Sequence, residues 1–158
     1  MSAAQAFAQP PQVAKQVAFT TLAPREIHRL SPAEIRQAIA GMVAEGRMEL
    51  AVSIAEAALA LYPKSEDVLV IASLLAETNQ DWLRAETLLI ELATVQGADS
   101  TAGTWLHLIK VLNCQEKWDD AWLAATYACE RFPKDANLAQ ELQQLSKMIH
   151  PESQSRTA

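Results

Sequence analysis

Apolar residues recur at helical spacing through most of the chain, and short polar segments separate the apolar runs. One run places its members three or four residues apart: Ala51, Ile54, Ala55, Ala58, Leu59 and Tyr62. The runs that begin at Ala85 and Ala121 follow nearly the same spacing. Residues spaced in this way share one face of an α-helix. The pattern therefore predicts an all-α protein in which each of these helices buries one stripe.

A polar break comes directly before each of these three helices, at residues 45–47, 79–81 and 115–117. Another helical stretch precedes each break, over residues 33–44, 66–78 and 102–114. Each unit is thus predicted to be a helix, a tight turn and a second helix. Ser31, Pro32 and Glu34 form a capped helix start, so order is expected to begin at Ser31. A last amphipathic run, residues 135–149, has no second helix and is predicted to cap the stack.

The units repeat at a nearly constant interval. Ala51, Ala85 and Ala121 are 34 and then 36 residues apart, and a large side chain lies three residues before each of them. The longer interval has a simple cause, because residues 96–103 form a glycine-containing loop with about two extra residues. Self-similarity at a period of this length is typical of a solenoid of helical hairpins.

These positions resemble the tetratricopeptide repeat (TPR) family, which uses 34-residue hairpins with small residues at the eighth, twentieth and twenty-seventh positions and proline at the thirty-second. The matching residues are Ala51, Ala85 and Ala121 at twenty, Ala58 and Ala128 at twenty-seven, Pro63 and Pro133 at thirty-two, Met48, Trp82 and Trp118 at seventeen, Gly46 at fifteen, and Trp105 at four. The departures are Ile39, Ser73 and Ile109 at eight, and Leu92 and Gly97 in the middle unit. The resemblance covers about residues 32–149. It implies a TPR-like α-solenoid of three helix–turn–helix repeats plus a C-terminal capping helix.

Three segments are expected: an N-terminal arm at residues 1–30, a helical repeat domain at residues 31–149 and a disordered tail at residues 150–158. The arm carries Pro10, Pro11 and Pro24, which favours flexibility. It also carries apolar residues, among them Phe19 and Leu22. Docking on its own domain or on a partner, and plain disorder, both remain open for this arm.

The family resemblance implies that the first helices of the hairpins line a concave groove. The positions carried over to this chain are Arg36, Ala40, Val43, Val70, Leu74, Glu77, Leu106, Lys110 and Asn113. An apolar centre with charges near its ends suits a peptide or helical segment with hydrophobic anchors. Lys110 and Asn113 come from one unit only, which disfavours a site for a terminal carboxylate. The alternatives are that the arm covers this strip or that its residues belong to the core.

Four tryptophans bear on possible interfaces, since aromatic residues often anchor them. Trp82, Trp105 and Trp118 occupy family core positions and are expected to be buried. Trp122 lies on the adjacent face. It is the candidate surface anchor, together with Phe19 and Leu22 of the arm, at a possible homodimer contact.

Charge and chemistry narrow the function. The formal charge of −6 disfavours nucleic acid as a partner. Cys114 and Cys129 have no metal or redox spacing and are expected to be reduced and largely buried. No metal, cofactor or catalytic constellation is expected, so the chain is predicted not to be an enzyme. The absence of a signal-like start or a long apolar run predicts a cytoplasmic location without membrane insertion.

Together these patterns predict a module that binds a segment of another protein. The layout is similar to that of small bacterial TPR chaperones of type III secretion, in which an N-terminal arm often makes a dimer. A structural assembly subunit of a larger, secretion-type complex is the alternative. A regulatory domain of an enzyme is the weakest candidate.

Overall fold

A computed structural model describes residues 24–149, and within that range the chain is helical and contains no strand. This described range includes the 3-10 helices η2 (Pro24–Arg29) and η3 (Gly97–Asp99). The α-helices are α1 (Pro32–Ala44), α2 (Met48–Leu61), α3 (Glu66–Thr78), α4 (Trp82–Gln96), α5 (Ala102–Cys114), α6 (Trp118–Arg131) and α7 (Ala136–Ile149). The helices predicted from the apolar spacing are therefore confirmed, including the last one.

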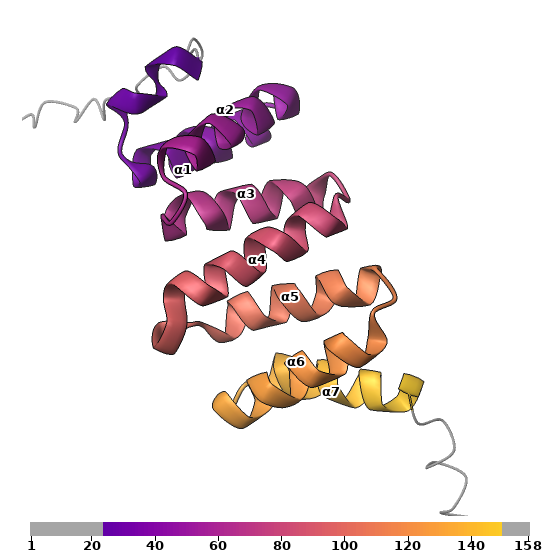
Figure 1. Ribbon diagram of the computed structural model, residues 1–158. Coiled ribbons are helices and arrows are strands. Elements are labelled where there is room, and N and C mark those ends of the chain that lie inside the picture. Colours follow the sequence, from indigo (N-terminus) through magenta and orange to yellow (C-terminus); the bar gives the residue numbers. More distant parts are fainter. Residues whose placement is uncertain (1–23, 150–158) are drawn as a thin grey trace, which may run out of the picture.

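The helices stack in a zigzag, and the two ends of the described chain lie at opposite ends of the stack (Figure 1). Each α-helix packs against the next α-helix along the chain. In addition, α1 contacts α3, and α5 contacts α7. The equivalent middle pair, α3 and α5, does not pack together in this way. This gap in the direct packing positions the candidate site described below.

The turns that join α1 to α2, α3 to α4 and α5 to α6 share one backbone geometry. Gly46, Gln80 and Glu116 each have a positive φ, at 74°, 58° and 58°. In each turn the residue after the positive-φ position donates a backbone hydrogen bond to a carbonyl near the end of the preceding helix. In the first turn the amide of Arg47 donates to the carbonyl of Met42 at 2.8 Å, and the other two turns have the equivalent bond. The polar breaks therefore make equivalent turns, which confirms that the chain is built from repeated helical hairpins.

Small side chains allow the helices of each hairpin to approach closely. Ala51, Ala85 and Ala121 are fully buried. A methyl side chain keeps the second helix close to its neighbours, and a larger one would hold it away. Ala58 and Ala128 are also fully buried, seven residues further along their helices, whereas the middle hairpin has Leu92 at that position.

Several helix starts are capped, and the start predicted at Ser31 is one of them. Ser31 forms a reciprocal capping box with Glu34, and the hydrogen bonds from Ser31 lower the pKa of the Glu34 carboxyl. Thr101 caps α5, and Asp135 accepts hydrogen bonds from the first amides of α7. Ser65, which directly precedes α3, makes no such bond.

The predicted boundary of the N-terminal arm needs correction. Residues 1–30 were expected to lie outside the repeat domain, yet Ile27 of η2 is buried in the core and the hydroxyl of Tyr62 donates a hydrogen bond to the Leu30 carbonyl at 3.1 Å. The packed part therefore extends back to η2. Residues 1–23 and the predicted tail at residues 150–158 lie outside the described range.

Two further expectations about burial are wrong. Cys114 is exposed, because it is the last residue of α5 and adjoins the turn. Cys129 is partly buried, and this burial raises the pKa of its thiol. Trp118 is 38% exposed at the start of α6, whereas Trp82 and Trp105 are partly buried against the core.

Candidate functional site

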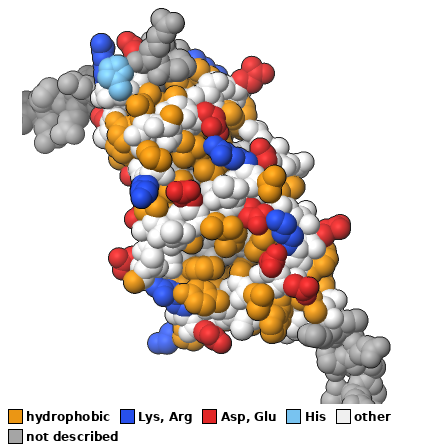
Figure 2. Space-filling view, in the orientation of Figure 1, with side chains coloured by type: hydrophobic (Ala, Val, Ile, Leu, Met, Phe, Trp, Pro, Cys, Tyr) orange, Lys and Arg blue, Asp and Glu red, His pale blue; other side chains and the backbone are white. Residues whose placement is uncertain are grey.

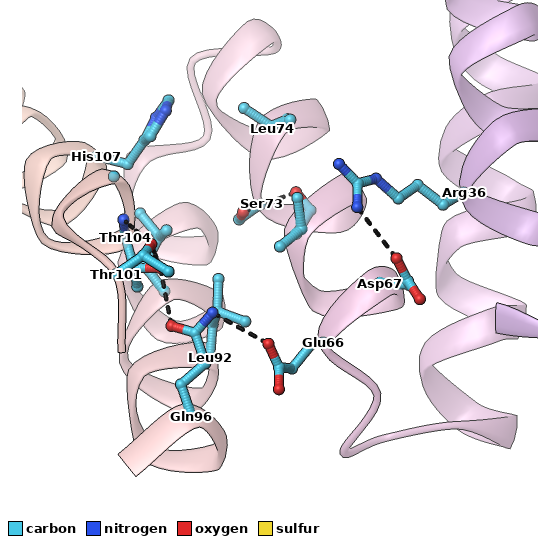
Figure 3. A pocket seen from close by; sticks show the side chains of 13 residues that line it. Arg36, Glu66, Asp67, Ser73, Leu74, Leu92, Gln96, Thr101, Thr104 and His107 are labelled. Carbon is cyan, nitrogen blue, oxygen red and sulfur yellow. Dashed lines mark hydrogen bonds and ion pairs between the residues drawn. The ribbon is translucent and has the colours of Figure 1, made fainter. Parts of the chain in front are cut away.

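The candidate site is a groove of about 560 Å³ that lies between α3 and α5. Its residues come from four helices, and Figure 3 shows them as sticks. They are Arg36 of α1, Glu66, Asp67, Val70, Ser73 and Leu74 of α3, Leu89, Leu92 and Gln96 of α4, and Thr101, Gly103, Thr104 and His107 at the start of α5. We call this surface the α3–α5 groove.

The groove exists because α3 and α5 do not pack directly on each other. Where α2 and α6 carry Ala58 and Ala128, the flanking helices meet: α1 contacts α3, and α5 contacts α7. At the matching position of α4, Leu92 is buried and forms part of the groove floor. Its larger side chain fills space that α5 would otherwise take. The departure from the repeat pattern at Leu92 thus coincides with the opening.

The connection after α4 also differs from the other two. The loops that follow α2 and α6 contain Pro63 and Pro133, whereas α4 is followed directly by Gly97, whose φ of 52° and ψ of −118° suit glycine. The helix is 15 residues long, compared with 14 for α2 and for α6. The added length and η3 carry Gln96 and Thr101 to the mouth of the groove.

The floor and one wall of the groove are apolar. Leu89 and Leu92 are buried at the bottom, and Val70 and Leu74 of α3 line the side. Leu74 is 38% exposed, which is high for a leucine in the middle of a helix that is otherwise largely buried. This arrangement can accept an apolar side chain from outside, since it offers contact area that no described residue covers.

A chain of hydrogen bonds runs from the opposite wall, formed by α5 and the end of α4, across to Glu66 of α3. Thr104 donates to the Gln96 oxygen at 2.9 Å, and the Gln96 amide donates to the Glu66 carboxylate at 3.2 Å. Because the Thr104 hydroxyl proton points to Gln96, the Thr101 hydroxyl donates to Thr104 across 3.1 Å. All three donors point toward the carboxylate, which strengthens each bond in turn. The wall is therefore polar and ordered (Figure 3).

An ion pair and a histidine–carboxylate contact lie at the edges of the groove. Arg36 reaches from α1 to Asp67 at 3.1 Å. His107 of α5 lies 2.9 Å from the carboxylate of Glu77 on α3 and joins the two separated helices. The hydrogen bond to Glu77 raises the pKa of His107, and partial burial and Lys110 act in the opposite direction.

The structure brings together only part of the predicted groove set. Arg36, Val70 and Leu74 line the groove, and Glu77 adjoins it through His107. The other predicted residues do not line it. Ala40 and Lys110 are exposed elsewhere, Val43 and Leu106 are partly buried against the core, and Asn113 is partly buried with a side-chain oxygen that has no hydrogen-bond partner in the described part of the chain.

Several groove residues were not predicted from the sequence. In the third unit Gly103, Thr104 and His107 take the place expected for Leu106, Lys110 and Asn113. The floor residues Leu89 and Leu92 come from a second helix, whereas the prediction took all positions from first helices. The departures at Leu92 and Gly97 were the signals in the sequence that the middle of the stack differs.

The candidate interface residues divide between described and undescribed parts. Trp122 is partly buried against the core and, with Leu142 of α7, lines a shallow apolar hollow of about 520 Å³. Phe19 and Leu22 lie outside the described range. Large apolar side chains that are exposed to solvent occur instead on α4 and α6: Leu83, Ile90, Leu123 and Tyr127. Figure 2 shows such side chains in patches between charged ones.

Comparisons with known proteins give no family for this chain. No protein-family model matches it. No curated protein matches it either. Within residues 24–149, no helix has both the length and the apolar character needed to cross a membrane.

Proposed function

We propose that the chain is a non-catalytic binding module, a TPR-like solenoid whose α3–α5 groove holds an apolar segment of a partner protein in the cytoplasm. The observation that carries the proposal is the leucine floor of the groove, with Leu74 left exposed beside it. An apolar depression with a polar, hydrogen-bonded rim is the usual form of a site for hydrophobic anchors. The repeated hairpins, the buried alanines and the cap formed by α7 support the TPR assignment.

The partner segment is expected to place apolar side chains over Leu74 and Leu92 while its backbone or polar groups meet the opposite wall. Thr101, Thr104 and Gln96 already form a network, so they present a fixed set of donors and acceptors. An ordered rim lowers the entropic cost of binding. A chaperone that shields a secretion substrate, or an adaptor, would use the groove in this way.

The test is affinity capture from the native cell lysate with the full chain and two variants. Leu74→Glu places a carboxylate at the groove, where burying it under an apolar side chain costs enough to lower capture about tenfold or more. Leu83→Glu is the matched control, because Leu83 is 69% exposed on α4 and does not line the groove. A dominant partner that the Leu74 variant loses and the Leu83 variant keeps supports the proposal. Equal capture by both variants contradicts it.

A structural assembly subunit is the second candidate, and the exposed side chains on α4 and α6 favour it. Leu83 and Ile90 are seven residues apart and share one face of α4, and Leu123 and Tyr127 share one face of α6. Exposed apolar side chains at such spacing are typical of surfaces that another protein covers. Stoichiometric partners that Leu83→Glu releases and Leu74→Glu keeps would favour this candidate over the groove.

A further inference from the structure

The rim of the α3–α5 groove carries one acidic group without a matching cation. Asp67 pairs with Arg36, and Glu77 faces His107. Glu66 accepts a hydrogen bond from Gln96 but has no cationic side chain within ion-pair distance in the described part of the chain. An occupant with one cation beside apolar side chains would therefore match both the charge and the floor of the groove.

Residues 13–22 of this chain have that chemistry. Their sequence is VAKQVAFTTL, with Lys15 as the one charged residue and Val17 and Phe19 after it. Residues 1–23 contain no acid, so the rest of the chain carries a formal charge of −7 against the +1 of this segment. In an extended conformation alternate residues share a face, which would put Lys15, Val17 and Phe19 on one side.

The length of chain before η2 is sufficient to reach the groove. η2 packs on α2, and both α2 and α1 pack on α3. Axes of packed helices lie about 8–10 Å apart, so two such steps place α3, which forms one wall of the groove, roughly 16–20 Å from η2. An extended chain spans about 3.3 Å per residue, and the residues from Phe19 to Pro24 cover roughly 17 Å while those from Lys15 cover roughly 30 Å.

We propose that residues 13–22 occupy the α3–α5 groove of their own chain, with Lys15 against Glu66 and Val17 and Phe19 over Leu74 and Leu92. The segment then covers the leucine floor until a partner displaces it. This inference rests on the proposed function, since it assigns a competitor to the same groove. The internal segment is tethered to the groove and is therefore present at a high effective concentration. A partner must bind tightly enough to displace it.

The experiment is zero-length carbodiimide cross-linking of the full chain, followed by peptide mass spectrometry. The reagent joins an amine to a carboxylate that it already contacts, and the expected product is an amide between Lys15 and Glu66. Phe19→Glu and Leu74→Glu should each lower its yield about tenfold, because each places a carboxylate in the apolar contact. Leu83→Glu should leave the yield unchanged. An equal mixture of ¹⁵N-labelled and unlabelled chains should give linked peptides of one label only.

Two results would overturn the inference. One is a spread of Lys15 links over exposed acids outside the groove, and the other is linked peptides of mixed label. Partner capture separates this failure from failure of the proposed function. If the Lys15–Glu66 link is absent but Leu74→Glu still releases the partner, the groove binds a partner without an internal competitor. If the inference holds, Phe19→Glu should increase capture of that partner.

Discussion

The contact between His107 and Glu77 joins α5 to α3 at a place where these helices are otherwise apart. The Nδ1 atom of His107 lies 2.9 and 3.0 Å from the two carboxylate oxygens, and the Glu77 side chain is 19% exposed. The raised pKa of His107 means that the folded state binds the imidazole proton more tightly than the unfolded chain does. The pair therefore couples the edge of the groove to pH.

Stability should fall as pH rises through the pKa of folded His107. Its contribution is complete below the unfolded pKa, near 6.5, and disappears above the raised folded pKa. Because His107 is 43% exposed, the effect should be below about 1 kcal/mol. Chemical denaturation between pH 6 and pH 8.5 measures it. His107→Gln should remove the pH-dependent difference, and a variant that keeps the full slope would show that another group carries it.

A second charged contact responds in a different pH range. Lys117 donates to Glu86 at 2.6 Å and lowers the pKa of that carboxyl, and Gln115 donates to the same oxygen. A lowered carboxyl pKa gives stability that is present above the unfolded pKa and is lost as pH falls through the folded value. This acid-range loss does not overlap the loss expected for His107, so the two can be measured separately.

At the scale of the elements, the three hairpin turns are alike in geometry but differ in residue type. The positive-φ position holds Gly46 in the first hairpin, Gln80 in the second and Glu116 in the third. Left-handed backbone costs a residue with a Cβ atom about 1–2 kcal/mol, whereas glycine adopts it readily. The second and third turns are therefore less favourable than the first.

Exchanging residue types between turns should shift stability in opposite directions. Gln80→Gly should raise the free energy of unfolding by about 0.5–1 kcal/mol, because the relief of strain exceeds the added freedom of the unfolded chain. Gly46→Ala should lower it by about 1 kcal/mol, and nothing lies near its added Cβ, so the loss reports backbone strain alone. Urea unfolding of both variants tests this. A loss of stability in both would mean that the side chain of Gln80 supports its turn.

The elements were largely predictable from the sequence, but the site was less so. A period of 3.6 residues and the polar breaks located the helices, since burial of one face imposes that spacing. The rotation of a helix about its own axis is set by the neighbours on which it packs. Leu92 stands where the other hairpins have alanine, and the contact between α5 and α3 is reduced there. As a result α5 turns His107 and Thr104 toward the groove, and not the predicted Leu106. No local pattern around Leu106 indicates this.

The whole molecule is a stack in which helices pack mainly on near neighbours along the chain. α7 contacts α6 and α5, and α1 contacts α2 and α3, while no extensive contact joins the two ends of the described chain. In such an arrangement, stability is the sum of local terms and interfaces between neighbours. A helix at one end of the stack can then unfold while the middle stays folded. Unfolding of a middle helix instead exposes the helices that pack on both of its sides.

Truncating one buried leucine at the end and one in the middle of the stack should give different patterns of amide hydrogen exchange. Leu145 of α7 is fully buried and Leu89 of α4 is nearly so, and Leu→Ala costs about 2–5 kcal/mol at such sites. Leu145→Ala should speed exchange in α7 and, to a lesser degree, in α6, with α1–α3 unchanged because they share no interface with α7. Leu89→Ala, the matched substitution, should speed exchange on both sides of α4. If Leu145→Ala instead speeds exchange equally in all helices, the stack unfolds as one unit, and binding at the α3–α5 groove would then stabilise its ends as strongly as its centre.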